Sequence, residues 1–94
     1  MLQASPVDNF LRHALALEYI KAGNDVEAER LFKTILTQSP DYVGSYYHLA
    51  KLLERNGNTQ EAISWYEQGM QTAKRLNDTH AYNELQSAYE DLVY

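Results

Sequence analysis

The sequence predicts an all-α fold in which five antiparallel helices stack as helix-turn-helix repeats. The first observation is a repeated phrase: residues 23–28 (GNDVEA) return as residues 57–62 (GNTQEA), 34 residues later. The second is that apolar residues between the breaks follow the three-and-four spacing of a helix face. The third is that no alternating apolar run predicts a strand. A fixed period of this length indicates stacked repeats, here within one domain of 94 residues.

The first two predicted helices are separated by Gly23. Pro6 suits a first helical turn, and Ser5 or Asp8 can cap that end. Helical apolar spacing then runs from Phe10 to Ile20. A glycine just past a helix adopts the left-handed conformation without steric cost, so Gly23 ends this helix.

The second and third predicted helices meet at Ser39–Pro40. Asn24 begins the second helix, and Glu27 three residues later gives the spacing of a capping box. We expect the third helix to open at Ser39–Pro40, with its apolar pattern at Tyr42, Val43, Tyr46, Leu49, Ala50, Leu52 and Leu53.

The fourth and fifth helices follow similar signals. Asn58 with Glu61 repeats the predicted cap after Gly57. Lys74 stands where the period predicts a proline, so the fourth helix is expected to run to about Arg75. The polar break 77–79 precedes a fifth helix. The longest break is expected to be about three residues, which makes neighbouring helices antiparallel.

These residues resemble the tetratricopeptide repeat, whose signature is aromatic-x2-Leu-small-x2-Tyr, then Ala-x3-Phe, then Pro. The first copy reads Arg12-x2-Leu15-Ala16-x2-Tyr19, Ala28-x3-Phe32, Pro40. The second reads Tyr46-x2-Leu49-Ala50-x2-Leu53, Ala62-x3-Tyr66, with Lys74 for Pro, and a half copy reads Tyr82-x2-Leu85-Gln86-x2-Tyr89. The resemblance implies a short right-handed α-solenoid, with repeats at about 6–39 and 40–76 and a solvating terminal helix at about 79–93 that carries Glu84, Glu90 and Asp91.

The small signature residues predict where paired helices cross. Ala16 and Ala28 are expected at a close crossing, with Leu15 and Phe32 filling the volume beside it. Gln86 stands where a small residue is expected, which suits a last helix that no other helix must approach closely.

The resemblance also implies a concave groove that receives a peptide, lined by the first helix of each repeat. Carried over residue by residue, the groove would present Phe10, His13, Leu17, Tyr47, His48, Lys51, Arg55, His80, Asn83 and Ser87. Its cations would suit an acidic peptide or a terminal carboxylate. The alternative is an ordinary solvated helix face. Family members that clamp a chaperone tail use Lys, Asn, Asn, Lys and Arg, and the matching places here hold His13, Leu17, His48, His80 and Glu84, which argues against such a partner.

A second function class is self-association. Leu11, Leu17 and Ile20 widen the apolar face of the first helix beyond what one partner helix covers, and no helix caps that end of the stack. Two such ends could meet in an isologous homodimer.

Composition argues against other classes of function. The net charge of −5 disfavours nucleic acid, and no apolar run is long enough to span a membrane. The chain has no cysteine and no predicted signal peptide, so we expect a cytoplasmic protein. The three histidines would bind a metal only if they converged, and no His-x3-His pair supports that. No phosphate loop or nucleophile motif predicts an enzyme, so no catalytic residue, metal or cofactor is assigned.

Overall fold

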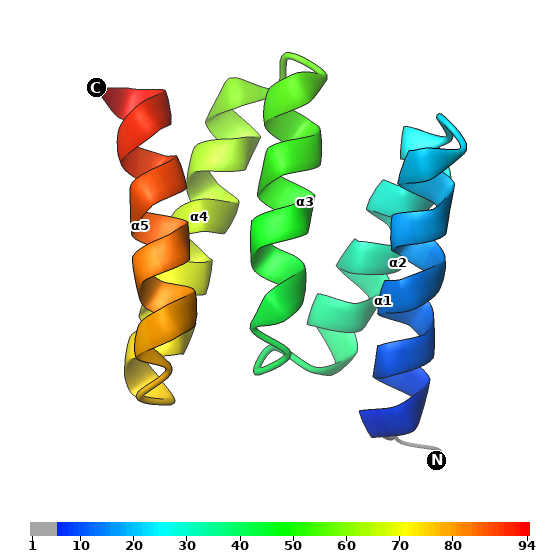
Figure 1. Ribbon diagram of the computed structural model, residues 1–94, viewed down its shortest axis with the longest axis horizontal. Coiled ribbons are helices and arrows are strands. Elements are labelled where there is room, and N and C mark those ends of the chain that lie inside the picture. Colours follow the sequence, from blue (N-terminus) through cyan, green and yellow to red (C-terminus); the bar gives the residue numbers. More distant parts are fainter. Residues whose placement is uncertain (1–5) are drawn as a thin grey trace.

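The protein is an array of five consecutive helices over the residues that the structure describes (Figure 1). This computed structural model describes residues 6–94, with the side chains from Asp8 onward. The helices are α1 (Pro6–Lys21), α2 (Asp25–Gln38), α3 (Gly44–Arg55), α4 (Thr59–Arg75) and α5 (Thr79–Val93). Each runs antiparallel to the next, and α1, α3 and α5 form one layer in front of α2 and α4 (Figure 1). The all-α solenoid predicted from the sequence is confirmed.

Three of the four breaks between helices share one hydrogen-bond pattern. After α1, the amide of Asn24 donates to the carbonyl of Tyr19, five residues back, with N···O 2.8 Å. The amides of Asn58 and Asp78 make the equivalent 2.8 Å bonds after α3 and α4. This pattern requires a left-handed residue in the turn. That residue is Gly23 (φ 80), Gly57 (φ 84) or Asn77 (φ 59).

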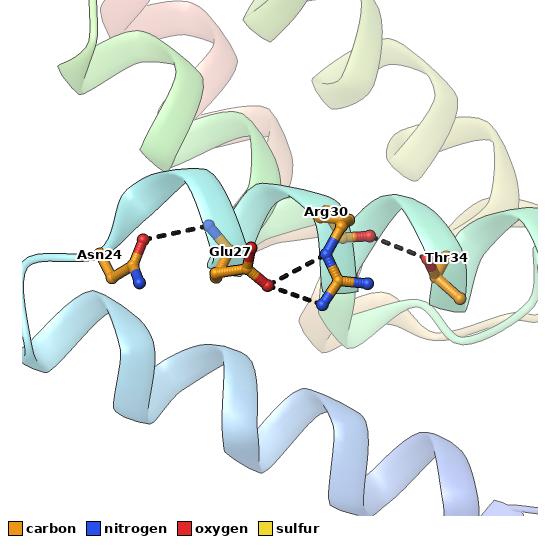
Figure 2. A network of polar contacts seen from close by, with 4 residues as sticks. All are labelled: Asn24, Glu27, Arg30 and Thr34. Atoms are coloured by element: carbon orange, nitrogen blue, oxygen red, sulfur yellow. Dashed lines mark hydrogen bonds and ion pairs between the residues drawn. The ribbon is translucent and has the colours of Figure 1, made fainter.

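The predicted capping box forms only in part at α2, and the equivalent cap at α4 does not form. Figure 2 shows the Asn24 side-chain oxygen accepting from the amide of Glu27, while the Glu27 carboxylate binds Arg30 instead of reaching back to the cap. The side chain of Asn58 makes no capping bond to α4. Glu61, its expected partner, instead binds Lys33 at 2.8 Å. Of the two residues predicted to cap α1, Ser5 lies outside the described residues, and Asp8 lies inside the first turn of the helix.

The link between α2 and α3 is longer than expected. The segment from Ser39 to Val43 is not helical, and α3 begins only at Gly44. The expectations that the third helix opens at Ser39–Pro40 and that breaks are about three residues long are therefore wrong here. The phenol of Tyr46 donates to the carbonyl of Pro40 at 2.7 Å, which holds this link against α3.

The core runs along the line where the two layers meet. Its fully buried members, each with no exposed side-chain area, are Ala16, Ala28, Phe32, Ile35, Leu49, Ala50, Leu52, Leu53, Ala62, Tyr66 and Ala73. The alanines that the repeat signature places at helix crossings are all among them. None of the helices in the described part of the chain has the length and hydropathy needed to cross a membrane.

The helices α3, α4 and α5 approach one another closely at Gly69 of α4. A β-carbon at this position would stand 2.7 Å from the β-carbon of Tyr46 on α3 and 3.1 Å from Leu85 on α5. Glycine therefore lets α4 lie directly against both neighbours.

Candidate functional site

The residues that the sequence places at a ligand site lie on α1, α3 and α5, which form one layer (Figure 1). We define the odd-helix face as these predicted residues plus two acidic residues of α5, Glu84 and Asp91. Phe10 is the most exposed apolar member, with 64% of its surface accessible. The half-buried members are His13, Leu17, Tyr47, His48 and Lys51, and the exposed ones are Arg55, His80, Asn83, Ser87, Glu84 and Asp91.

An aromatic cluster joins the two repeats at this face. The ring centroid of His13 on α1 lies 5.2 Å from that of His48 on α3. Phe32 of α2 and Tyr42 of the α2–α3 link lie 5.5 and 5.7 Å from His13. Tyr47 continues the cluster at 5.5 Å from His48. The structure thus brings three predicted site residues, His13, Tyr47 and His48, into one contact set.

The two histidines of this cluster are neutral near pH 7. Burial, and secondarily the nearby His48, lowers the pKa of His13 to about 4. Burial also lowers the pKa of His48, and the carboxylate of Glu84 opposes that effect. A ring nitrogen of His13 is 2.9 Å from the hydroxyl of Ser45, so the imidazole shares a hydrogen bond across the α1–α3 contact. These rings act here as packing groups.

The predicted cations of α3 already have carboxylate partners. The guanidinium of Arg55 donates to both carboxylate oxygens of Asp25 at 2.8 Å. This contact, made by one terminal nitrogen of the guanidinium, lowers the pKa of Asp25 and links the end of α3 to the start of α2. The Lys51 ammonium lies 3.9 Å from the carboxylate of Glu54 and 5.9 Å from the ring centroid of Tyr47. The pair of open cations expected for an acidic ligand is therefore not available in this arrangement.

Two carboxylates of α5 belong to the odd-helix face, and the sequence reading assigned them only to solvation. Glu84 is close enough to α3 to affect the pKa of His48, and Asp91 contributes to the raised pKa of Tyr66, after the larger effects of burial and Glu54. Both side chains are exposed, and no ion pair or hydrogen bond among the described residues engages either. Their separation of seven residues, two helical turns, was the available signal that they share one face.

At the α1 end of the stack, two leucines are exposed at positions whose counterparts in the next repeat are buried. Leu11 and Leu15 are 57% and 47% exposed. Ser45 and Leu49, 34 residues further on, are fully buried. In the described part of the chain, no helix covers α1 in the way that α2 covers α3.

This register corrects two expectations. Leu15 was expected to fill volume beside the α1–α2 crossing, but its side chain points out of the core, while Phe32 fills the predicted place. Leu17 and Ile20 were expected to widen the uncovered face, yet both are half-buried against the core. Of the three residues named for that face, only Leu11 belongs to it.

The histidines do not form a metal centre with other common ligands. His13 and His48 are adjacent, whereas His80 is an exposed residue of α5. Among the residues described, no group of three or more His, Asp or Glu side chains is arranged to hold a metal ion.

Comparisons with known proteins agree with this architecture. The family model described as Tetratricopeptide repeat matches residues 19–89. A tetratricopeptide repeat domain protein from Salinibacter ruber is 42% identical, and its crystal structure superimposes with a TM-score of 0.86 over 90% of this chain and 94% of that one. Its solution NMR structure gives a TM-score of 0.89, also at 42% identity, over 95% of this chain and 90% of that one.

A longer relative shows the same repeat. The interferon-induced protein with tetratricopeptide repeats 3 from Mus musculus is 23% identical over 92 residues, which is 98% of this chain. The chain spans only 22% of the length of that relative. Tetratricopeptide repeats are generally non-enzymatic modules for protein–protein interaction. The match to the family model, the shared fold and the repeated signature show that this chain belongs to the tetratricopeptide repeat family.

Proposed function

We propose that this chain is a scaffold that binds a peptide or protein segment along the odd-helix face. The observation that carries the proposal is the combination of an exposed Phe10 with the aromatic cluster beside it. A large exposed aromatic next to half-buried rings is the composition that interface centres favour, since it provides apolar area at low cost in side-chain entropy. The proposal assigns no catalytic step, metal or cofactor, and it retains the cytoplasmic location expected from the sequence.

A display library of random peptides, selected against the purified chain, tests the proposal. Phe10→Ala should reduce binding of the selected peptides by about tenfold, as loss of an exposed anchor does at typical interfaces. Val26→Ala is the matched control, because Val26 is 76% exposed but lies on α2, in the other layer. Selected peptides that bind the Phe10→Ala chain as well as the original would contradict the assignment of this face.

Self-association is the second candidate, and the exposed pair Leu11 and Leu15 favours it. Packing two α1 helices against each other would bury both leucines of each copy, in an isologous interface that uses the same patch twice. Each leucine that moves from exposed to buried contributes about 1–2 kcal/mol.

Sedimentation equilibrium over a wide concentration range tests this second candidate. We expect a dimer that Leu11→Lys converts to a monomer and that Val26→Lys leaves intact. A chain that stays monomeric at every concentration would refute the candidate without affecting peptide binding at the odd-helix face.

A further inference from the structure

We propose that the segment bound at the odd-helix face is basic, with an apolar side chain against α1 and Lys or Arg side chains against α5. This inference rests on the proposed function and specifies the chemistry of the partner.

The face changes from apolar to acidic between its two edges. On α1 it presents Phe10 and Leu17, and Lys21 near the end of that helix is paired with Glu18 at 3.6 Å. On α5 it presents Glu84 and Asp91, two exposed carboxylates with no cationic partner among the described residues. A segment lying across the face therefore meets apolar surface first and negative charge last.

The middle helix does not neutralise this negative edge. Asp25 occupies the guanidinium of Arg55 with two 2.8 Å hydrogen bonds, and Glu54 lies 3.9 Å from the ammonium of Lys51. His48 on α3 is close enough to Glu84 for that carboxylate to affect its pKa, but burial lowers this pKa, so His48 is uncharged near pH 7. The positive charges of the face are therefore compensated locally, while the carboxylates of α5 are not.

The geometry of α5 indicates how the partner's charges would be spaced. Glu84 and Asp91 are seven residues apart, which at 1.5 Å per residue is about 10 Å along the helix. Because this separation runs along α5, while the segment crosses from α1 to α5, two neighbouring Lys or Arg side chains at the α5 end of the segment would diverge to reach the two carboxylates. The chain's net charge of −5 adds long-range attraction for a basic segment and repels anionic partners.

The peptides selected from the random library provide the test, with two variants of α5. We expect the selected sequences to be enriched in Lys and Arg. The double variant Glu84→Gln with Asp91→Asn should weaken their binding about fivefold, the size expected for two exposed ion pairs. Raising the salt concentration should weaken binding to the original chain more than binding to the double variant.

Glu90→Gln is the matched control, because residue 90 lies about 120° around the helix from residue 84 at 3.6 residues per turn. Unaltered binding by this variant is expected. Selected peptides that lack basic residues, or an equal loss in Glu90→Gln and in the double variant, would overturn the inference. If Phe10→Ala weakens binding of the peptides but the double variant binds them as tightly as the original chain, only the charge preference is overturned and the proposed function stands. If Phe10→Ala also binds the peptides as tightly as the original chain, both the charge preference and the proposed function are overturned.

Discussion

Replacing Gly69 by alanine tests whether α4 is held directly against α3 and α5. The added β-carbon would lie 2.7 Å from the β-carbon and 3.1 Å from the γ-carbon of Tyr46, and 3.1 Å from a methyl group of Leu85. Carbon atoms in contact prefer about 3.5–4.0 Å, so all three approaches are too short. The β-carbon of Tyr46 is fixed by the α3 backbone, and its phenol is bonded to Pro40, so α3 and α4 must separate.

Two effects of opposite sign set the size of the change. Alanine in place of glycine inside a helix stabilises by about 1 kcal/mol. Overpacking a buried site typically costs about 1–3 kcal/mol, and three simultaneous overlaps place Gly69→Ala at the upper end. The net expectation is a loss of about 2 kcal/mol, which for a domain of this size lowers the melting temperature by about 8–16 °C.

Urea unfolding followed by circular dichroism measures this loss directly. Gly44→Ala is the control, since nothing lies within 4 Å of a β-carbon there and its backbone conformation suits any residue. We expect Gly44→Ala to be neutral or slightly stabilising, with an unchanged dependence on urea. A Gly69→Ala chain as stable as the original, beside a normal Gly44→Ala, would refute the packing described for α4.

Two further changes are expected to alter stability. Ala28→Leu should cost about 1–3 kcal/mol by overpacking the fully buried α1–α2 crossing, and an unchanged melting temperature would show that the crossing is looser than described. Stability should fall as the pH is lowered from 6.5 to about 4, because His13 has its pKa lowered to about 4 in the fold and the unfolded chain binds the proton more readily in that window. The loss is at most about 3 kcal/mol, and about 1–2 kcal/mol once solvent screening of a half-buried ring is included. His13→Gln should flatten this part of the pH profile, whereas a matching change at the exposed His80 should not.

Local signals in the sequence were enough to predict that the helices form, but not where all of them begin. Gly23 and Gly57 end helices because the turn geometry requires a left-handed residue, and that requirement acts within a few residues. The extension of α4 to Arg75 was also predicted from a local signal, because Lys74 stands in place of the proline that would have ended the helix. The start of α3 was missed because Tyr46 holds Pro40 from six residues away, a contact that apolar spacing does not reveal.

The candidate site was predicted less well because its properties depend on distant partners. Arg55 was expected to be open to a ligand, but Asp25, thirty residues earlier, occupies it. Leu15 carries the same signature as the buried Leu49, and only the presence or absence of a covering helix distinguishes them. A repeat signature specifies which residue faces a neighbouring repeat, and the fold decides whether that neighbour exists.

The sequential arrangement of the helices also has a kinetic consequence. Each helix packs chiefly against the helix that precedes or follows it, and the layer contact between α3 and α5 is minor. Few long loops must close before native contacts form. We therefore expect folding within roughly microseconds to milliseconds, as is typical of helical proteins with low contact order. Because α2, α3 and α4 have packed neighbours on both sides, while α1 and α5 each pack chiefly against one helix, the amides of the three middle helices should exchange with deuterated solvent most slowly.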